Sequence, residues 1–364
     1  MKKTNLAKKL TAMAMTGTMV MSMGMTAFAA EVPTEFDFTK EITTDGNTVA
    51  PAVKFTFDVT PGTDSASGVS PVVTAGPEGG LTVGDVEFNG DENANEEGTY
   101  SKTGKLNVNI SAFDGLAPGI YSYVLSEKDF EVPSTGKNPY EGINKDTTEY
   151  TLYVYMTDDD LNGELEYKGV TTTVLGEDAE VDTKVPSLTF TNDYGKDNDG
   201  THDLTIRKLV AGNQGNKTHP FSFTVKIDGA AGEKYKVAYG DETDVIASGE
   251  TKEFTLAHDA TFVIYGLSES DTYTITEKNN DGDLTGYETT VSKQNVISSS
   301  ADSGEGVLEQ TGTVNADEAT VNYTNTKNVT TPTGIAMTFA PYALMVVFAG
   351  VFAVMFLRKK REDF

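Results

Sequence analysis

The chain has 364 residues, with 28 Lys and Arg against 55 Asp and Glu, which gives a formal net charge of −27 at pH 7. So acidic a chain is a poor partner for nucleic acid or for an anionic membrane surface, and its charge favours solubility outside the cell. The sequence contains no cysteine, which excludes disulfide bonds and any adhesin that acts through a thioester.

The first 29 residues have the features of a secretory signal peptide. Four lysines within the first nine residues precede an apolar, methionine-rich segment over residues 10–25, and Ala-Phe-Ala at residues 27–29 forms a small-x-small cleavage site. We therefore expect the mature chain to begin at Ala30. Without the four signal lysines and the charges of the C-terminal tail, the net charge of the remaining body is −33.

Short segments of alternating apolar and polar residues, separated by Gly, Asn, Asp and Pro, follow along the first half of the body. This alternation is typical of half-buried β-strands, and no convincing helical period lies between the segments. The expected strands of the first half lie at residues 36–42, 53–59, 105–110, 121–127, 149–156 and 188–192.

A polar, turn-rich segment at residues 193–203 is expected to be a linker, because a second series of alternating segments begins after it. The 304 residues from Ala30 to Thr333 suit two domains better than one. We expect an all-β fold of two tandem immunoglobulin-like sandwiches, at residues 30–195 and 196–328. The expected strands of the second half lie at residues 204–210, 221–227, 253–256, 261–265, 272–277 and 319–325.

The C-terminal segment, residues 329–364, has three parts. Thr331-Pro332-Thr333-Gly334 precedes a predominantly apolar stretch of 23 residues at 335–357, which is long enough to span a bilayer with some tilt. Four basic residues follow and would stay on the cytoplasmic side. A Pro-Thr-Gly peptide just outside a C-terminal span resembles the cell-wall sorting signal of Gram-positive surface proteins. This resemblance implies that a sortase cuts between Thr333 and Gly334 and passes the Thr333 carboxyl group to an amine. An ordinary tail anchor is the alternative.

Three polar residues of the first half fall on the core-facing side of expected strands. Successive side chains of a strand point to opposite faces, so residues two apart share a face. By this count Lys40 lies on the apolar face of the first strand. Glu127 lies on the apolar face of a later strand, and Asn192 lies on that of the last strand.

The second half repeats these residue types in the same order, as Lys208, Glu277 and Asn325. Any one of them alone would be read as a lysine that snorkels or a glutamate that is solvated at a strand end. An unpaired buried Lys or Glu costs several kcal/mol. A pattern that occurs twice in one chain therefore indicates that something in each domain compensates for the buried charges.

This arrangement resembles the intramolecular isopeptide domains of Gram-positive pilins and adhesins, in which a lysine amine attacks an asparagine carboxamide and ammonia leaves. Burial would keep the amine neutral and the carboxyl group protonated, so that the Glu can polarise the amide and shuttle protons. The reaction occurs once per domain, so the chain is not expected to be a turnover enzyme. The resemblance implies two crosslinks, each helped by a catalytic glutamate: Lys40–Asn192 with Glu127, and Lys208–Asn325 with Glu277.

The segments LTIRKLVAGN, YTITEK and VNYTNTK of the second half, and more loosely FDFTKEI, YVLSEKD and LTFTND of the first, are similar to the major (backbone) pilins of the FctA type. The resemblance implies a structural subunit that a sortase joins to other copies of itself in a covalent polymer. It also implies minor pilins or a tip adhesin as partners, a pilus anchored to peptidoglycan at the cell surface, and a role in adhesion. It implies no cofactor.

A sortase polymer needs an acceptor amine on the next subunit. In FctA-type pilins this lysine lies shortly before the last strand of the first domain, and Lys184 occupies that place, eight residues before Asn192. Lys184 is therefore the acceptor that the resemblance implies. Lys168 and Lys196 are the alternatives.

Other chemistry has little support in the sequence. The three histidines, at positions 202, 219 and 258, lack metal-ligand spacing, and no HExxH, nucleophile elbow or phosphate loop occurs. Asp-rich segments at residues 197–200 and 281–283 lack the distal Glu of an EF-hand and are interpreted as turns, so no metal site is expected. The alternatives are an adhesin of the same sandwiches anchored singly to the wall and, with no motif in its favour, a wall-attached hydrolase.

Overall fold

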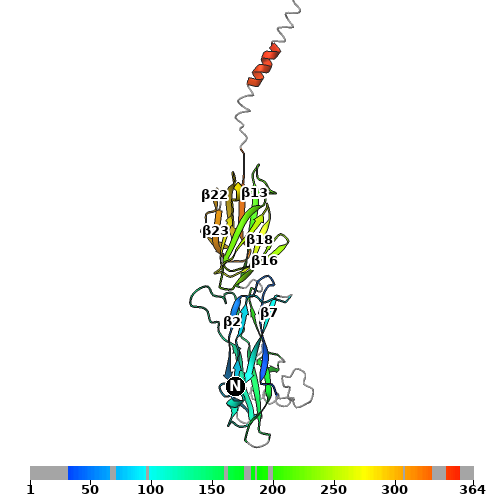
Figure 1. The fold of residues 1–364 in the computed structure, drawn as a ribbon, viewed down its shortest axis with the longest axis vertical. Coiled ribbons are helices and arrows are strands. Elements are labelled where there is room, and N and C mark those ends of the chain that lie inside the picture. Colours follow the sequence, from blue (N-terminus) through cyan, green and yellow to red (C-terminus); the bar gives the residue numbers. More distant parts are fainter. Residues whose placement is uncertain are drawn as a thin grey trace, which may run out of the picture.

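The computed structural model describes residues 32–65, 71–95, 98–159, 163–175, 182–184, 187–195, 200–305, 308–329 and 342–352. Apart from short 3-10 turns and a helix at residues 342–352, the regular structure of these residues consists of β-strands. Figure 1 shows the strands gathered in two lobes that are stacked end to end along the long axis of the molecule. The expected all-β fold is confirmed.

The first lobe contains a four-stranded sheet in the order β12-β1-β7-β5 and a sheet in the order β11-β10-β9-β8-β3, whose β8 also pairs with β4. A small two-stranded sheet joins β2 to β6. Strands β1 and β12 are parallel neighbours although they stand at opposite ends of the domain sequence. The strands are β1 (Glu35–Thr43), β2 (Ala52–Phe55), β3 (Phe57–Pro61), β4 (Val73–Ala75), β5 (Leu81–Val83), β6 (Val86–Asn89), β7 (Thr99–Val108), β8 (Gly119–Glu127), β9 (Glu149–Thr157), β10 (Glu166–Leu175), β11 (Asp182–Lys184) and β12 (Thr189–Asp193).

The second lobe contains a sheet in the order β16-β15-β18-β13-β24-β20-β22 and a sheet in the order β17-β14-β19-β23-β21. Its first and last strands, β13 and β24, are again parallel neighbours. The strands are β13 (His202–Ala211), β14 (Phe221–Asp228), β15 (Lys234–Tyr239), β16 (Glu242–Ala247), β17 (Thr251–Leu256), β18 (Thr261–Leu267), β19 (Thr272–Glu277), β20 (Glu288–Gln294), β21 (Val296–Ser298), β22 (Ser303–Glu305), β23 (Leu308–Val314) and β24 (Ala319–Thr326).

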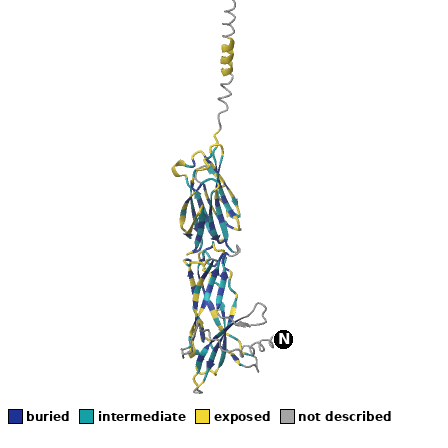
Figure 2. Cartoon of the chain, turned by 90° about the vertical axis from the view of Figure 1, so that its right-hand side faces the viewer, coloured by how far each residue is buried: buried dark blue, intermediate teal, exposed yellow. Residues whose placement is uncertain are grey.

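Each lobe has a hydrophobic core of its own, to which its strands contribute every second side chain. Strand β14 shows the pattern most clearly, because Phe221, Phe223, Val225 and Ile227 are buried and the residues between them are only partly buried. Figure 2 shows buried residues along the strands of both lobes. The period-2 reading of the sequence therefore places the core-facing side chains correctly.

Two expected strands differ from those observed by more than one or two residues at an end. Residues 53–59 were expected to be one strand, but the chain changes hydrogen-bonding partner at Thr56. Phe55 pairs with Val86 of β6, whereas Phe57 pairs with Glu127 of β8. The side chains keep alternating across this point, so periodicity alone cannot reveal the break. The expected strand at residues 105–110 begins earlier, at Thr99, and ends at Val108, because a 3-10 turn, η1 (Ile110–Phe113), begins two residues later.

The expected linker is shorter than the polar segment that predicted it. Strand β12 continues to Asp193 and β13 begins at His202, so both ends of residues 193–203 belong to strands. Tyr194 is buried and forms an antiparallel bridge with Ile143. Polar composition indicates a loop, but it does not show how far flanking strands continue into it.

Residues 342–352, which lie within the predicted membrane span, form an exposed helix. Among the helices of the described ranges, none is long and apolar enough to cross a bilayer. The predicted span at 335–357 extends beyond the described residues on both sides. The predicted signal peptide at residues 1–29 also lies outside them.

Candidate functional site

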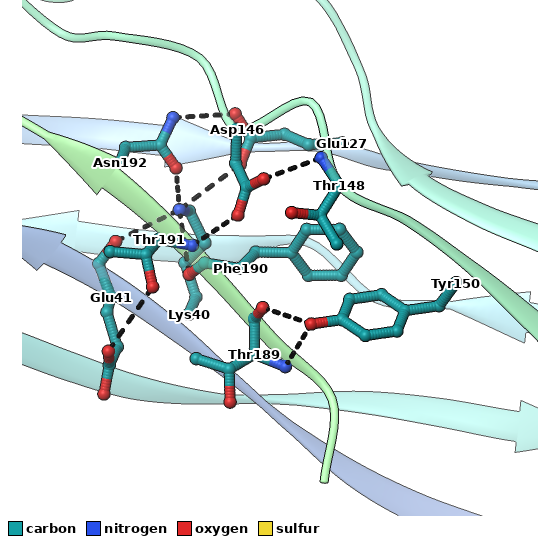
Figure 3. A network of polar contacts seen from close by, with 10 residues as sticks. All are labelled: Lys40, Glu41, Glu127, Asp146, Thr148, Tyr150, Thr189, Phe190, Thr191 and Asn192. Carbon is teal, nitrogen blue, oxygen red and sulfur yellow. Dashed lines mark hydrogen bonds and ion pairs between the residues drawn. The ribbon is translucent and has the colours of Figure 1, made fainter. Parts of the chain in front are cut away.

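The structure brings together the three polar residues predicted in the first domain. Lys40 on β1, Glu127 at the end of β8 and Asn192 on β12 are all buried. Lys40 Nζ lies 3.2 Å from Glu127 Oε2 and donates to Asn192 Oδ1. Asn192 Nδ2 donates to Glu127 Oε1 at 2.9 Å. Each member of this group therefore contacts the other two inside the core (Figure 3).

The second domain assembles the same three residue types. Lys208 on β13, Glu277 at the end of β19 and Asn325 on β24 are each 0% exposed. Glu277 Oε1 lies 2.7 Å from Lys208 Nζ and accepts a hydrogen bond of 2.8 Å from Asn325 Nδ2. Thr289 donates through Oγ1 to Asn325 Oδ1 at 2.9 Å. The sequence did not predict this contact of the Thr289 hydroxyl.

The two groups share one scaffold. In both domains the Lys and Asn come from the parallel first and last strands of one sheet, and the Glu reaches them from the facing sheet. The register is also the same, because Asn192 is the Cα partner of Ile42 and Asn325 is the Cα partner of Val210. Each asparagine thus lies opposite the residue two positions after its lysine. Strand alternation places the two side chains on the same core-facing side.

Burial shifts the pKa values of both lysine–glutamate pairs. Loss of water lowers the pKa of Lys40 and lowers that of Lys208 to about 8, although the neighbouring carboxylates act in the opposite direction. Burial likewise raises the pKa of Glu127 and Glu277, against the attraction of the lysines. Desolvation penalises the charged form of each group. Both pairs are therefore shifted toward a neutral amine and a protonated carboxyl group.

Aromatic rings form the apolar wall around each amine. Lys40 Nζ lies 4.3 Å from the centre of the Phe55 ring, and Lys208 Nζ lies 4.6 Å from that of Phe221. These rings exclude water, which is what makes the charged form of the amine costly. A neutral amine that is held against an amide in such a pocket is a competent nucleophile.

A further carboxylate in the first domain was not predicted from the sequence. Asp146 accepts hydrogen bonds from the backbone N–H of Thr191 at 2.6 Å and of Thr148 at 2.7 Å. It therefore fixes the backbone immediately before Asn192, as Figure 3 shows. Its negative charge also raises the pKa of Lys40 and of Glu127, as a smaller effect than burial.

The remaining predicted site residues are the proposed acceptor lysine and the sortase cleavage site, and the histidines of the sequence are considered with them. The backbone of Lys184 ends β11, the edge strand of its sheet, and pairs with Thr173 of β10. Thr333 and Gly334 lie outside the described residues. The histidines have structural partners, since His202 Nδ1 contacts Asp317 at 2.8 Å, His219 Nε2 contacts Asp283 at 3.2 Å, and His258 Nδ1 accepts from the N–H of Val210 at 2.9 Å.

A second buried polar cluster lies where the two domains meet, and sequence reasoning missed it. Tyr235 Oη lies 2.8 Å from Glu233 Oε2 and 3.0 Å from Asp271 Oδ2, and all three side chains are buried. Burial raises the pKa of Glu233 and raises that of Asp271 to about 7. The first domain closes over this cluster with Tyr194, whose pKa the two carboxyl groups help to raise.

Three lysines join the domains around this cluster. Lys137 of the first domain donates to the carbonyl oxygen of Ser270 at 2.6 Å and also contacts that of Asp228. Lys236 donates to Asn47 Oδ1 at 2.9 Å. Lys234 pairs with Asp91, and Glu141 accepts from the N–H of Ser270 at 3.1 Å. The junction is therefore a polar interface that is built from specific contacts.

Comparisons with known proteins agree with this architecture. Residues 36–195 match the FctA family, described as a Spy0128-like isopeptide-containing domain, and residues 202–327 match a domain of unknown function, DUF7601. A curated protein named pilin, from Streptococcus pyogenes serotype M1, is 28% identical over 279 residues, which are 74% of this chain and 75% of the pilin.

Solved structures of major pilins from Streptococcus pyogenes share the fold. One, from serotype GAS13637, has a TM-score of 0.55 at 22% identity and covers 81% of this chain and 100% of its own. Another has a TM-score of 0.55 at 21% identity and covers 81% of this chain and 99% of its own. The first domain therefore matches the FctA family of Spy0128-like isopeptide-containing domains, and the chain as a whole is similar to the major pilins of the Gram-positive bacterium Streptococcus pyogenes.

Proposed function

We propose that the protein is the major subunit of a covalent pilus and that each domain is locked by a Lys–Asn isopeptide bond. The observation that carries this proposal is the repeated buried group of Lys, Glu and Asn, with the same strand register in both domains. The relationship to major pilins supports it. The bonds would be Lys40–Asn192 and Lys208–Asn325, formed with the help of Glu127 and Glu277.

The chemistry is an amide exchange in which all atoms are accounted for. The lone pair of the neutral lysine Nζ attacks the asparagine Cγ, and the carbonyl electrons move onto Oδ1. The protonated glutamate gives its proton to Nδ2, ammonia leaves as the Cγ–Nδ2 bond breaks, and the glutamate recovers a proton from Nζ. The products are one secondary amide and one ammonia, and the glutamate is regenerated. Fixed proximity inside the core supplies much of the rate.

Assembly would use the two ends of the chain. A sortase would cut between Thr333 and Gly334 and join the Thr333 carboxyl group to a lysine of the next subunit, for which we propose Lys184. The position of β11 supports this choice, because β11 is the last strand of its sheet among the described residues, and an edge strand can pair with an incoming chain. The signal peptide, transient membrane anchoring and final attachment to peptidoglycan are parts of the same proposal.

The expected result in the native host is a ladder of high-mass species in denatured wall extracts of the wild type. Lys184→Arg should remove the ladder completely, because an arginine side chain lacks the amine that becomes the amide nitrogen. Lys168→Arg is the matched control, since Lys168 is another lysine of the same sheet, on β10, and it should leave the ladder intact. A ladder that persists in Lys184→Arg and disappears in Lys168→Arg would assign the acceptor to Lys168.

The same experiment separates the pilin from the second candidate, an adhesin anchored singly to the wall. The feature in favour of that candidate is the sandwich fold itself, because a β-sandwich presents loops at both ends that can form a binding surface. It predicts one wall-linked species in wild type and in both variants. Absence of a ladder in the wild type would therefore reject the polymer while leaving the internal bonds to be tested separately.

The proposed bonds also determine how tension crosses the subunit. In each domain the bond joins two parallel neighbouring strands, β1 to β12 and β13 to β24. Force that enters near β12 would pass to β13, cross the Lys208–Asn325 bond and leave along β24. We expect single subunits pulled between residues 184 and 333 to extend without steps of domain length. Steps near the length of a whole domain would reject this force path.

A further inference from the structure

The two buried groups differ on one side of the asparagine. In the second domain β24 lies between β13 and β20, whereas in the first domain β12 ends the order of its four-stranded sheet. The register of β20 against β24 places Thr289 directly opposite Asn325. Thr289 is 0% exposed, and its hydroxyl reaches Asn325 Oδ1 at 2.9 Å.

The amide of Asn325 is therefore held at both of its polar atoms. Its Nδ2 faces Glu277 Oε1 at 2.8 Å, and the same carboxyl oxygen lies 2.7 Å from Lys208 Nζ. One oxygen of the glutamate thus touches both the attacking nitrogen and the nitrogen that leaves. The carbonyl oxygen points the other way, toward the hydroxyl of Thr289.

Resting on the proposed isopeptide function, we propose that Thr289 is a catalytic residue of the second domain that stabilises the oxyanion formed on Asn325 Oδ1. When Lys208 Nζ attacks Cγ, the carbonyl electron pair moves onto Oδ1, which the Thr289 O–H already contacts. Glu277 gives its proton to Nδ2 and takes one from Nζ, ammonia departs, and the carbonyl bond re-forms. Proton transfer and charge stabilisation are thereby divided between two residues on opposite sides of the amide.

The contacts of the asparagine are different in the first domain. Among its described residues, the side chain of Asn192 contacts Lys40 and Glu127 and no hydroxyl group. The chain beside β12 is instead the segment around Asp146, which holds the backbone N–H of Thr191. The first domain therefore serves as an internal reference that a change at Thr289 leaves untouched.

The test follows both bonds during synthesis of the chain from Ala30 to Thr333. Cell-free translation is quenched at intervals, and mass spectrometry of the digested protein measures the crosslinked fraction of Lys208–Asn325 and of Lys40–Asn192. Three variants separate the hydroxyl group from side-chain volume: Thr289→Val keeps the volume, Thr289→Ser keeps the hydroxyl, and Thr289→Ala loses both.

We expect Thr289→Val and Thr289→Ala to slow the Lys208–Asn325 bond to a similar extent, roughly 10²- to 10³-fold as for the loss of one oxyanion donor. Thr289→Ser should stay close to wild type, and Lys40–Asn192 should form at an unchanged rate in all variants. A packing role predicts instead that Val is normal and that Ser and Ala are slow, which would overturn the proposal. If the wild type forms neither bond, the proposed function fails; if it forms both and the variants follow volume, only the role of Thr289 fails.

Discussion

Glu277→Gln is expected to leave the second domain without its crosslink, so that the protein loses one ammonia fewer than wild type. Glutamine keeps the size of the side chain, but it cannot give a proton to the departing ammonia. The intact mass should therefore rise by about 17 Da relative to wild type, beyond the change due to the substitution itself. The first domain should keep its bond, because Glu127 is unchanged.

The same variant should also lose stability. The bond between residues 208 and 325 closes a loop of 117 residues, and in the chain-entropy picture a crosslink of that length contributes roughly 4–5 kcal/mol. For a domain of this size we expect the thermal midpoint of the second domain to fall by on the order of 10–20 °C. Glu253→Gln, an exposed glutamate of the same sheet, is the matched control and should change neither mass deficit nor midpoint. A Glu277→Gln protein that carries both bonds would contradict the assigned role.

The carboxyl cluster at the domain junction should make the second domain less stable as the pH rises from about 4 to about 7. Burial raises the pKa of Asp271 from its ordinary value of 3.8 to about 7, and it also raises that of Glu233. Between these values the native state holds a proton that the unfolded chain has released. The free energy of unfolding therefore decreases with pH in this range and becomes level above it. The change belongs to the Glu233 and Asp271 carboxyl groups together and is on the order of a few kcal/mol.

Several titratable groups face this cluster, so the pH dependence of the wild type must be compared with that of a variant. Tyr194, Lys137 and Glu141 approach the cluster from the first domain, and Tyr235 approaches it from the second domain. Glu277 also has a raised pKa and acts in the same sense, whereas Asp244 and Asp259 have lowered pKa values and act in the opposite sense. The quantity to measure is therefore the difference between wild type and variant. Asp271→Asn should flatten the fall in the midpoint of the second domain between pH 4.5 and pH 7.5. Glu269→Gln, an exposed neighbour in sequence, should retain it. Equal slopes in wild type and Asp271→Asn would show that Asp271 is ionised in the native protein.

The sequence predicted the all-β fold and the members of both buried groups because both depend on the period-2 geometry of strands. Once Lys40 and Asn192 are counted onto the apolar faces of the first and last strands, a parallel pairing of those strands is enough to bring them together. Periodicity carries no information about hydrogen-bonding partners. It therefore missed the change of sheet at Thr56, where the alternation of side chains continues unbroken.

The residues that sequence reasoning missed depend on contacts between distant segments. Thr289 lies in a polar segment, ETTVSKQ, whose composition predicts a solvent-exposed strand. In the structure this segment pairs with β24, and Thr289 is buried opposite Asn325. Glu233 and Asp271 follow turn-forming residues and read as exposed acids. In the folded chain both are buried and are joined through the hydroxyl of Tyr235, a contact between segments that are distant in sequence and that no local pattern encodes. Asp146 acts through the backbone of a strand 45 residues away.

The most direct test of the account is the intact mass of the recombinant body from Ala30 to Thr333. Each isopeptide bond expels one ammonia of about 17 Da, so two bonds place the mass about 34 Da below that of the sequence. We predict this deficit, together with crosslinked peptides that contain Lys40 with Asn192 and Lys208 with Asn325. A mass equal to that of the sequence would contradict the account, because both buried groups would then be unreacted.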